Sequence, residues 1–210
     1  MHALLATLAV LLAGPPSDRG IAVPIRLERA VERALERSSQ DSAATATLSG
    51  VAMPTTRQAA GASLVLNGMA LRKKAIFKVY VAALYLPAKS ADADAVLAAD
   101  APRLLVMRFV RDVERKKICE AWNEGLAANT PGADPRLRQQ FATLCGYMED
   151  MQNGEQMAFT YAPGEGTTVE VKGRLKGSLT GKDFADALFK CWIGPRPGPG
   201  EDFKRDLLGG

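Results

Sequence analysis

A long stretch of mainly apolar residues runs from residue 70 to residue 86 and ends at Pro87. Its first part carries several cations and its last part is apolar. Because this stretch is about three times as long as an average strand, it predicts a long central strand. Such a strand must be paired on both sides and covered by another layer, so the pattern predicts a substantial curved sheet.

Side chains on a strand alternate between two faces. One face would mix cations, a phenol and apolar residues: Arg72, Lys74, Ile76, Lys78, Tyr80, Ala82 and Leu84. The other would be apolar and predicts the core face: Leu71, Ala75, Phe77, Val79, Val81 and Tyr85. The mixed face suits a pocket for a ligand with an acidic or oxyanionic head and an apolar body. The alternative is that its cations simply lie on a solvated outer surface.

The neighbouring segments predict further strands and one short helix. Residues 63–66 predict a short strand, and Asn67-Gly68 is a typical two-residue hairpin turn that would pair it with the long strand. Residues 92–99 predict a short helix, and the apolar run over 103–110 predicts a buried strand.

Two longer helices are predicted in the middle of the chain from their apolar spacing. The first follows Asp112, which can cap it, and carries Ile118, Trp122 and Leu126. The second begins at Asp134-Pro135, a cap followed by proline at the first helical position. Its predicted buried stripe is Leu137, Phe141, Leu144 and Met148.

The last third of the chain predicts a second hairpin, with strands over 155–161 and 167–172. Helices over 182–193 and 201–208 follow. Strands, helices, strands and helices in this order predict an α+β domain whose mainly antiparallel sheet is covered on one side.

Composition and charge exclude several kinds of function. The 210 residues include 27 basic and 23 acidic side chains without clustered runs, which does not favour a nucleic-acid surface. The only histidine is His2, near the N-terminus. A domain without that segment has no imidazole, which excludes histidine-assisted nucleophiles and histidine zinc sites.

No metal or cofactor site is predicted. Cys119, Cys145 and Cys191 lie far apart in predicted helices, without the spacing of a zinc or redox site, although a disulfide between two of them stays open for an exported protein. Residues 177–182 superficially resemble a phosphate-binding loop. Their glycines are one residue too close, and Asp183 stands where a hydroxyl is required.

The N-terminal segment suggests export. Residues 3–13 form an uncharged apolar run, too short to span a bilayer, so residues 1–17 are a candidate signal peptide of a periplasmic or secreted protein. The run lacks a preceding Lys or Arg and a clean cleavage site, which leaves a cytoplasmic location as the alternative. Residues 18–48 predict a weakly ordered extension with a charged helix over 25–37, and the domain itself is expected over 49–209.

Three segments resemble bacterial chalcone-isomerase-like domains: Leu64 to Pro87, Gly181 to Gly194 and Asp202 to Gly209. The resemblance covers roughly residues 50 to 209 and includes two long segments in the right order. It implies an open-faced β-sandwich, in which a large antiparallel sheet carries a helical layer on one face and a ligand cleft lies between them.

The plant enzymes of this superfamily use an arginine to steer a phenolate into ring closure, and a threonine and a tyrosine around the developing enolate. Arg72 matches that arginine, but Tyr80 stands at the place of the threonine, and the helix around Ile118 offers no match for the tyrosine. Arginine with tyrosine resembles instead the fatty-acid-binding branch, in which the pair holds a carboxylate.

The pairing of these two side chains requires a turn. Eight residues of straight strand span about 26 Å, so Arg72 and Tyr80 could not reach one head group from a single strand. The family resemblance suggests a hairpin with the two residues on its arms, although residues 73–77 contain no typical turn residue.

The leading hypothesis is therefore a non-catalytic binder of a small apolar carboxylate or phenolate, such as a fatty acid, with Arg72 and Tyr80 as ligand-binding residues and no cofactor. One alternative is an isomerase or intramolecular lyase that uses Arg72 to stabilise an oxyanion. The other is a structural or interaction module whose cleft is filled by its own side chains.

Overall fold

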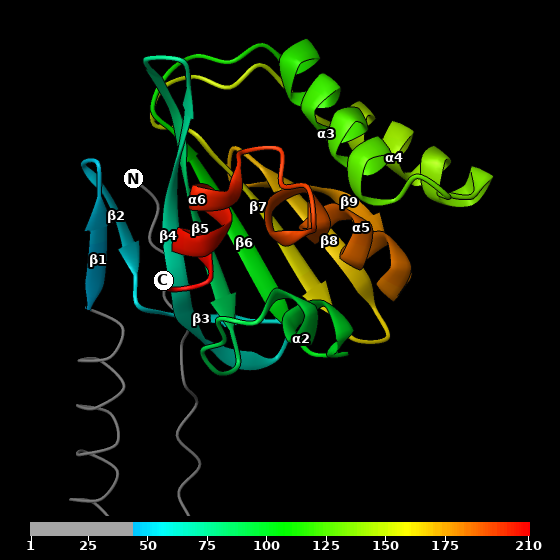
Figure 1. Ribbon diagram of the computed structural model, residues 1–210, viewed down its shortest axis with the longest axis horizontal. Helices are drawn as coiled ribbons and strands as arrows, with labels where there is room; N and C mark the ends of the chain where they lie inside the picture. Colours follow the sequence, from blue (N-terminus) through cyan, green and yellow to red (C-terminus); the bar gives the residue numbers. More distant parts are fainter. Residues whose placement is uncertain (1–43) are drawn as a thin grey trace, which may run out of the picture. The chain divides into compact units, whose positions relative to one another are not determined.

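Seven strands form one antiparallel sheet in which each strand pairs with its neighbours in sequence (Figure 1). The computed structural model describes residues 44–210; the candidate signal peptide and the predicted helix over 25–37 lie outside them. The strands are β3 Thr56–Ala59, β4 Ala62–Lys74, β5 Phe77–Leu86, β6 Arg103–Phe109, β7 Gln156–Ala162, β8 Gly166–Val171 and β9 Arg174–Leu179.

The predicted single strand over 70–86 is wrong, because a tight turn divides it into β4 and β5. Lys74 pairs with Phe77, so only Ala75 and Ile76 connect the arms. Ala75 has a φ of 52°, a left-handed conformation that costs a residue other than glycine roughly 1–2 kcal/mol. Pairing along both long arms holds the turn in place without glycine or asparagine.

The turn predicted at Asn67-Gly68 is also wrong, since both residues lie inside β4 at a break in its register with β5. The Asn67 side chain donates to the Ser90 and Leu207 carbonyl oxygens at 3.0 and 3.1 Å, and accepts from the Ser90 amide at 2.7 Å. A Cβ atom at Gly68 would lie 2.3 Å from the Asp206 carbonyl oxygen. The dipeptide therefore anchors the C-terminal segment against the sheet.

Helices cover one face of the sheet, and a short hairpin covers part of the other. The helices are α2 Ala93–Ala98, α3 Arg115–Asn129, α4 Pro135–Tyr147, α5 Lys182–Ile193 and α6 Glu201–Leu207. Figure 1 shows α5 and α6 in front of the sheet. Strands β1 Thr45–Leu48 and β2 Val51–Pro54 form the hairpin, although residues 45–48 were predicted to be linker. Within residues 44–210 no helix has the length and apolar character needed to cross a bilayer.

Both faces of β5 are buried from Val81 onward, which corrects the prediction of one core face, and Phe77, predicted for the core, is exposed. Ala82 and Leu84 belong to the large core beneath the helices. Ala83 and Tyr85 belong to a smaller core with Met53 of β2. The face that carries Tyr80 is therefore the helix-covered one over the inner part of the strand, whereas residues 73–78 at its outer end are exposed.

Most helix predictions are confirmed. Asp92 and Asp134 cap α2 and α4 through their side chains, and α5 has the predicted bounds. The prediction that Asp112 caps α3 is wrong, because α3 begins at Arg115, directly after Glu114. The Asp112 carboxylate accepts a hydrogen bond from the Asn153 backbone amide instead. Strand β9 was not predicted.

We expect Gly68→Ala to destabilise the fold, because the new methyl group meets backbone atoms of the C-terminal segment that cannot rotate away. Overpacking of this kind lowers the free energy of unfolding by about 1–3 kcal/mol. Urea denaturation measures the change. Gly146→Ala is the matched control, because a Cβ atom there has no neighbour within 4 Å. Equal stability of both variants would contradict the packing role of Gly68.

Candidate functional site

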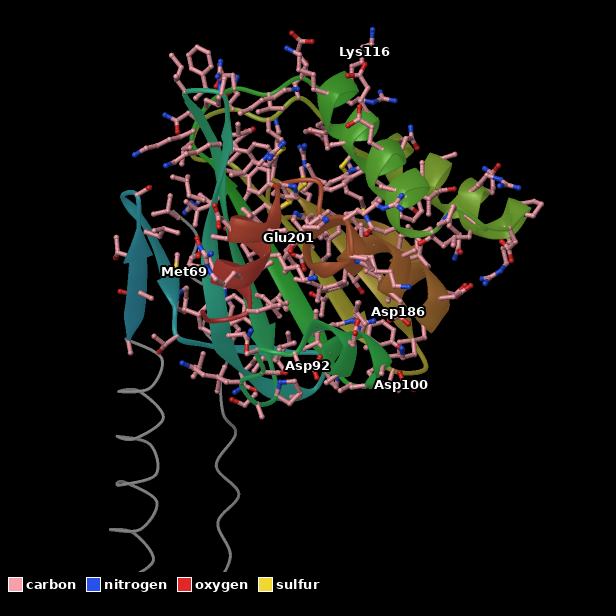
Figure 2. All side chains as sticks on the ribbon, in the orientation of Figure 1. Met69, Asp92, Asp100, Lys116, Asp186 and Glu201 are labelled. Carbon is pink, nitrogen blue, oxygen red and sulfur yellow. The ribbon has the colours of Figure 1, made fainter. Side chains whose placement is uncertain are left out.

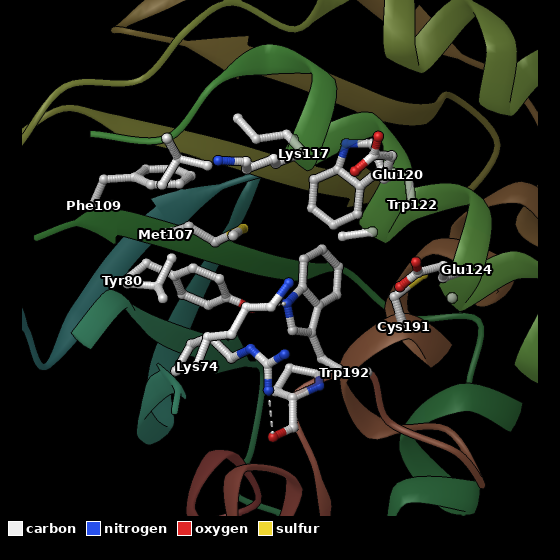
Figure 3. A pocket seen from close by; sticks show the side chains of 18 of the residues that line it. Lys74, Tyr80, Met107, Phe109, Lys117, Glu120, Trp122, Glu124, Cys191 and Trp192 are labelled. Carbon is white, nitrogen blue, oxygen red and sulfur yellow. Dashed lines mark hydrogen bonds between the residues drawn. The ribbon is translucent and has the colours of Figure 1, made fainter. Parts of the chain in front are cut away.

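A cavity of about 630 Å³ lies between the sheet and the helical layer. Its walls come from β4, β5 and β6 on one side and from α3, α5 and the segment after α5 on the other. Figure 3 shows Tyr80, Met107 and Phe109 on the sheet side, and Trp122 and Trp192 on the helix side. Its volume falls within the range of about 300–1,000 Å³ that is usual for small-molecule sites.

The hairpin places Arg72 and Tyr80 directly opposite each other. They are register partners on β4 and β5, and both line the cavity. Side chains opposite each other on one face have Cβ atoms about 5 Å apart. The turn at residues 75 and 76 therefore removes the separation that a single straight strand would impose.

Arg72 keeps most of its hydrogen-bonding capacity free. Its Nη1 donates to the Pro199 carbonyl oxygen at 2.9 Å, and the side chain is partly exposed. Among residues 44–210, no carboxylate lies within ion-pairing distance of its guanidinium. A guanidinium carries five N–H donors, so several remain available to a ligand.

Arg103 shows what a structural arginine looks like in this fold. It is 1% exposed and forms an ion pair with Asp186. Its guanidinium lies 4.9 Å from the ring centres of both Tyr161 and Phe189. Because its charge is compensated and its guanidinium is stacked, Arg103 has no role toward a ligand. Arg72 has no such carboxylate partner and no such ring contact among the described residues.

Tyr80 is arranged as a hydrogen-bond donor. Its hydroxyl oxygen accepts from Trp192 Nε1 at 3.2 Å, and the hydroxyl proton has no acceptor within the described residues. Desolvation raises the pKa of Tyr80 to about 12, against the opposing effects of the Trp192 hydrogen bond and the Arg72 charge. The phenol therefore keeps its proton at neutral pH and cannot serve there as a base.

The helix side of the cavity is aromatic. The Trp122 and Trp192 ring centres lie 5.2 Å apart in an edge-to-face arrangement, and Phe159 packs against both. Trp122 Nε1 is buried and has no hydrogen-bond partner in the part of the chain that the structure describes. An unsatisfied donor in an aromatic wall favours a ligand that brings an acceptor atom.

The charged residues around the cavity favour an anion. Five cationic and three acidic side chains line it: Arg72, Lys74, Arg111, Lys117 and Arg196, with Asp112, Glu120 and Glu124. Figure 3 shows Lys74 on the same side of the cavity as Tyr80, and Lys117 with Glu120 on the side of α3. An excess of positive charge beside apolar walls suits an amphipathic anion.

Cys191 also lines the cavity, but its chemistry is suppressed. Its thiol donates to the Ala187 carbonyl oxygen at 3.6 Å, and burial raises its pKa to about 12. A thiol is nucleophilic only as the thiolate, so Cys191 acts as a small apolar group here. No cluster of three potential metal-ligand side chains occurs within residues 44–210.

The sequence indicated only part of this site. Arg72 and Tyr80 are brought together as the family resemblance suggested. Trp122 was predicted as a core residue and proves to be a wall of the cavity. Neither the Trp192 hydrogen bond to Tyr80 nor the Pro199 hydrogen bond to Arg72 was predicted, since these residues lie 112 and 127 positions away in sequence.

Comparisons with known proteins agree with this architecture. A family model described as chalcone isomerase-like matches residues 44–209. The crystal structure of an Arabidopsis thaliana fatty-acid binding protein, AtFAP1, superposes with a TM-score of 0.64 at 18% sequence identity, covering 79% of this chain and 96% of that one. No curated protein sequence matches this chain. The fold is thus the expected α+β open-faced sandwich.

The raised pKa of Tyr80 predicts a loss of stability in alkali. The folded state holds the phenol proton up to about pH 12, whereas an unfolded tyrosine loses it near pH 10. The stabilisation is complete below pH 10 and disappears as the pH rises toward 12, an effect of about 2 kcal/mol. Denaturant unfolding at pH 9 and pH 11.5 should show a smaller decrease for Tyr80→Phe than for the native protein. Equal decreases would contradict this assignment.

Proposed function

Because the chain belongs to the chalcone isomerase-like family, we propose that it binds a small apolar carboxylate, such as a fatty acid, without catalysing a reaction. The observation that carries this proposal is Arg72. It is a guanidinium without a carboxylate partner among the described residues, opposite a protonated phenol and beside an aromatic cavity.

The proposed head-group site uses both residues. A guanidinium can give two parallel N–H bonds to one carboxylate. The Tyr80 hydroxyl, already oriented by Trp192, adds a third donor without adding charge. Arg72 would supply the charge that selects an anion, and Tyr80 would contribute to orientation.

The proposed site for the apolar body is the interior of the cavity. Met107 and Phe109 line it from β6, and Ile118 and Trp122 line it from α3. Burial of apolar surface contributes about 25 cal/mol per Å², so a long alkyl chain would gain more from these walls than a short one. The fatty-acid binding protein of similar fold supports this choice of ligand class.

Identification of the bound molecule is the direct test. Protein purified without added ligand is denatured and extracted with organic solvent, and the extract is compared by mass spectrometry with a mock purification. We expect enrichment of a long-chain carboxylic acid. No enriched apolar acid, together with no binding of added fatty acids, would overturn the proposal, and turnover of a chalcone above its spontaneous rate would contradict the non-catalytic part.

We expect Arg72→Ala to weaken fatty-acid binding by about a hundredfold, since it removes a charge and two charged hydrogen bonds worth roughly 3 kcal/mol. Tyr80→Phe should weaken binding by about tenfold. Titration of a fluorescent fatty acid measures both. Arg138→Ala is the matched control, because this exposed arginine of α4 does not line the cavity. Equal affinities of the Arg72 and Arg138 variants would exclude Arg72 from the site.

A further inference from the structure

The tip of the β4–β5 hairpin extends past the neighbouring strand. Pairing between β5 and β6 ends at Tyr80 and Phe109, whereas β4 and β5 continue to Lys74 and Phe77. Figure 1 shows the hairpin rising beyond the sheet at the top of the view. Residues 73–78 are all exposed. We call these six residues the hairpin tip.

The apex of the hairpin tip is apolar. Ile76 is 87% exposed and Phe77 is 54% exposed. Within residues 44–210 the third large hydrophobic residue with such exposure is Leu175, on β9. A two-residue turn is usually built from glycine, asparagine or aspartate, so isoleucine at this point serves neither the turn nor the core.

Cations without carboxylate partners surround the apex. Lys73, Lys74 and Lys78 belong to the hairpin tip and form no ion pair with any described residue. The Arg111 guanidinium lies 4.7 Å from the centre of the Phe77 ring. Lys116, at the start of α3, lies at the same end of the molecule in Figure 2.

The acidic residues near this end, Asp112, Glu114 and Glu120, are fewer than the cations. Glu114 lies 3.8 Å from Lys117. The Asp112 carboxylate accepts from the Asn153 amide. The excess charge at the hairpin tip is therefore positive.

We propose that the hairpin tip docks on the surface of an anionic lipid bilayer, with Ile76 and Phe77 inserted among the lipids and the lysines against the headgroups. Apolar side chains at a point with cations behind them match the layering of an anionic membrane surface. Two apolar residues are too little for a stable protein interface, which buries about 800 Å² on each partner.

Docking would bring the cavity to the membrane. The cavity reaches the hairpin tip, because Lys74 and Phe77 of the tip and Arg111 beside Phe77 also line the cavity. A docked protein would therefore open its site toward the lipid. A role of docking in the exchange of ligand with the membrane rests on the proposed function. The docking surface itself does not depend on what the cavity holds.

Vesicle sedimentation tests the docking. The full protein, without added fatty acid, is mixed with sucrose-loaded vesicles. One set is phosphatidylcholine alone, and the other contains roughly 30–40% phosphatidylglycerol, an acidic fraction that gives a strongly negative surface. We expect binding to the anionic vesicles at low salt, weaker binding at high salt, and little binding to phosphatidylcholine.

Two variants that leave the cavity lining intact separate the parts of the surface. Lys73→Gln with Lys78→Gln should weaken partitioning by about 25-fold, since each cation near an anionic surface contributes about fivefold. Ile76→Asp should weaken it by about tenfold or more, through lost insertion and added repulsion. Leu175→Asp is the matched control and should bind like the native protein, because the nearby Arg174 and Lys176 are paired with Glu149.

The results of the vesicle experiment can be told apart from a failure of the proposed fatty-acid binding. If native protein stays in the supernatant with anionic vesicles, the docking proposal is overturned, even if fatty acid binds in the cavity. That result would favour an acidic protein as the partner of the hairpin tip. Equal losses for Ile76→Asp and Leu175→Asp also overturn it. Selective loss in the two tip variants supports it, whether or not any fatty acid is found.

Discussion

The two-residue turn at Ala75 and Ile76 is the constraint on which the candidate site depends. It folds one long apolar stretch into two arms. A one-residue register shift between Arg72 and Lys73 then places Arg72 opposite Tyr80, whereas the regular register of the turn would place it opposite Val79. A longer loop or a register shifted by one residue would turn one of the two side chains to the other face of the sheet. The same turn carries the exposed tip, so the head-group site and the proposed membrane contact share one structural origin.

The C-terminal segment fixes the position of the arginine from the opposite direction. Asn67 and Gly68 hold the end of α6 against β4, and the Pro199 carbonyl before α6 accepts a hydrogen bond from Arg72. The segment is thus attached to β4 at both ends. The hydrogen bond to Pro199 holds one nitrogen of a guanidinium that lines the cavity, and the remaining N–H groups are unpaired within the described structure.

Local signals in the sequence were enough to predict most helices but not the central hairpin. Asp134-Pro135 and the apolar spacing after it determine α4 from a few adjacent residues. Asn67-Gly68 has the residues of a turn, yet its amide side chain bonds to residues 23 and 140 positions away. The real turn at residues 75 and 76 has no turn residues, because pairing along the arms outweighs the local preference.

The distribution of ion pairs explains how a small net charge can still produce a directed field. The net charge is only +4, but the carboxylates of Glu149 and Asp186 are already shared among cations elsewhere. Arg72 and the three lysines of the hairpin tip have no such partners among the described residues. Positive potential therefore concentrates at the cavity and the adjoining tip, where low-dielectric walls strengthen it. Net charge alone could not predict this asymmetry, since it arises from which carboxylates the fold brings to which cations.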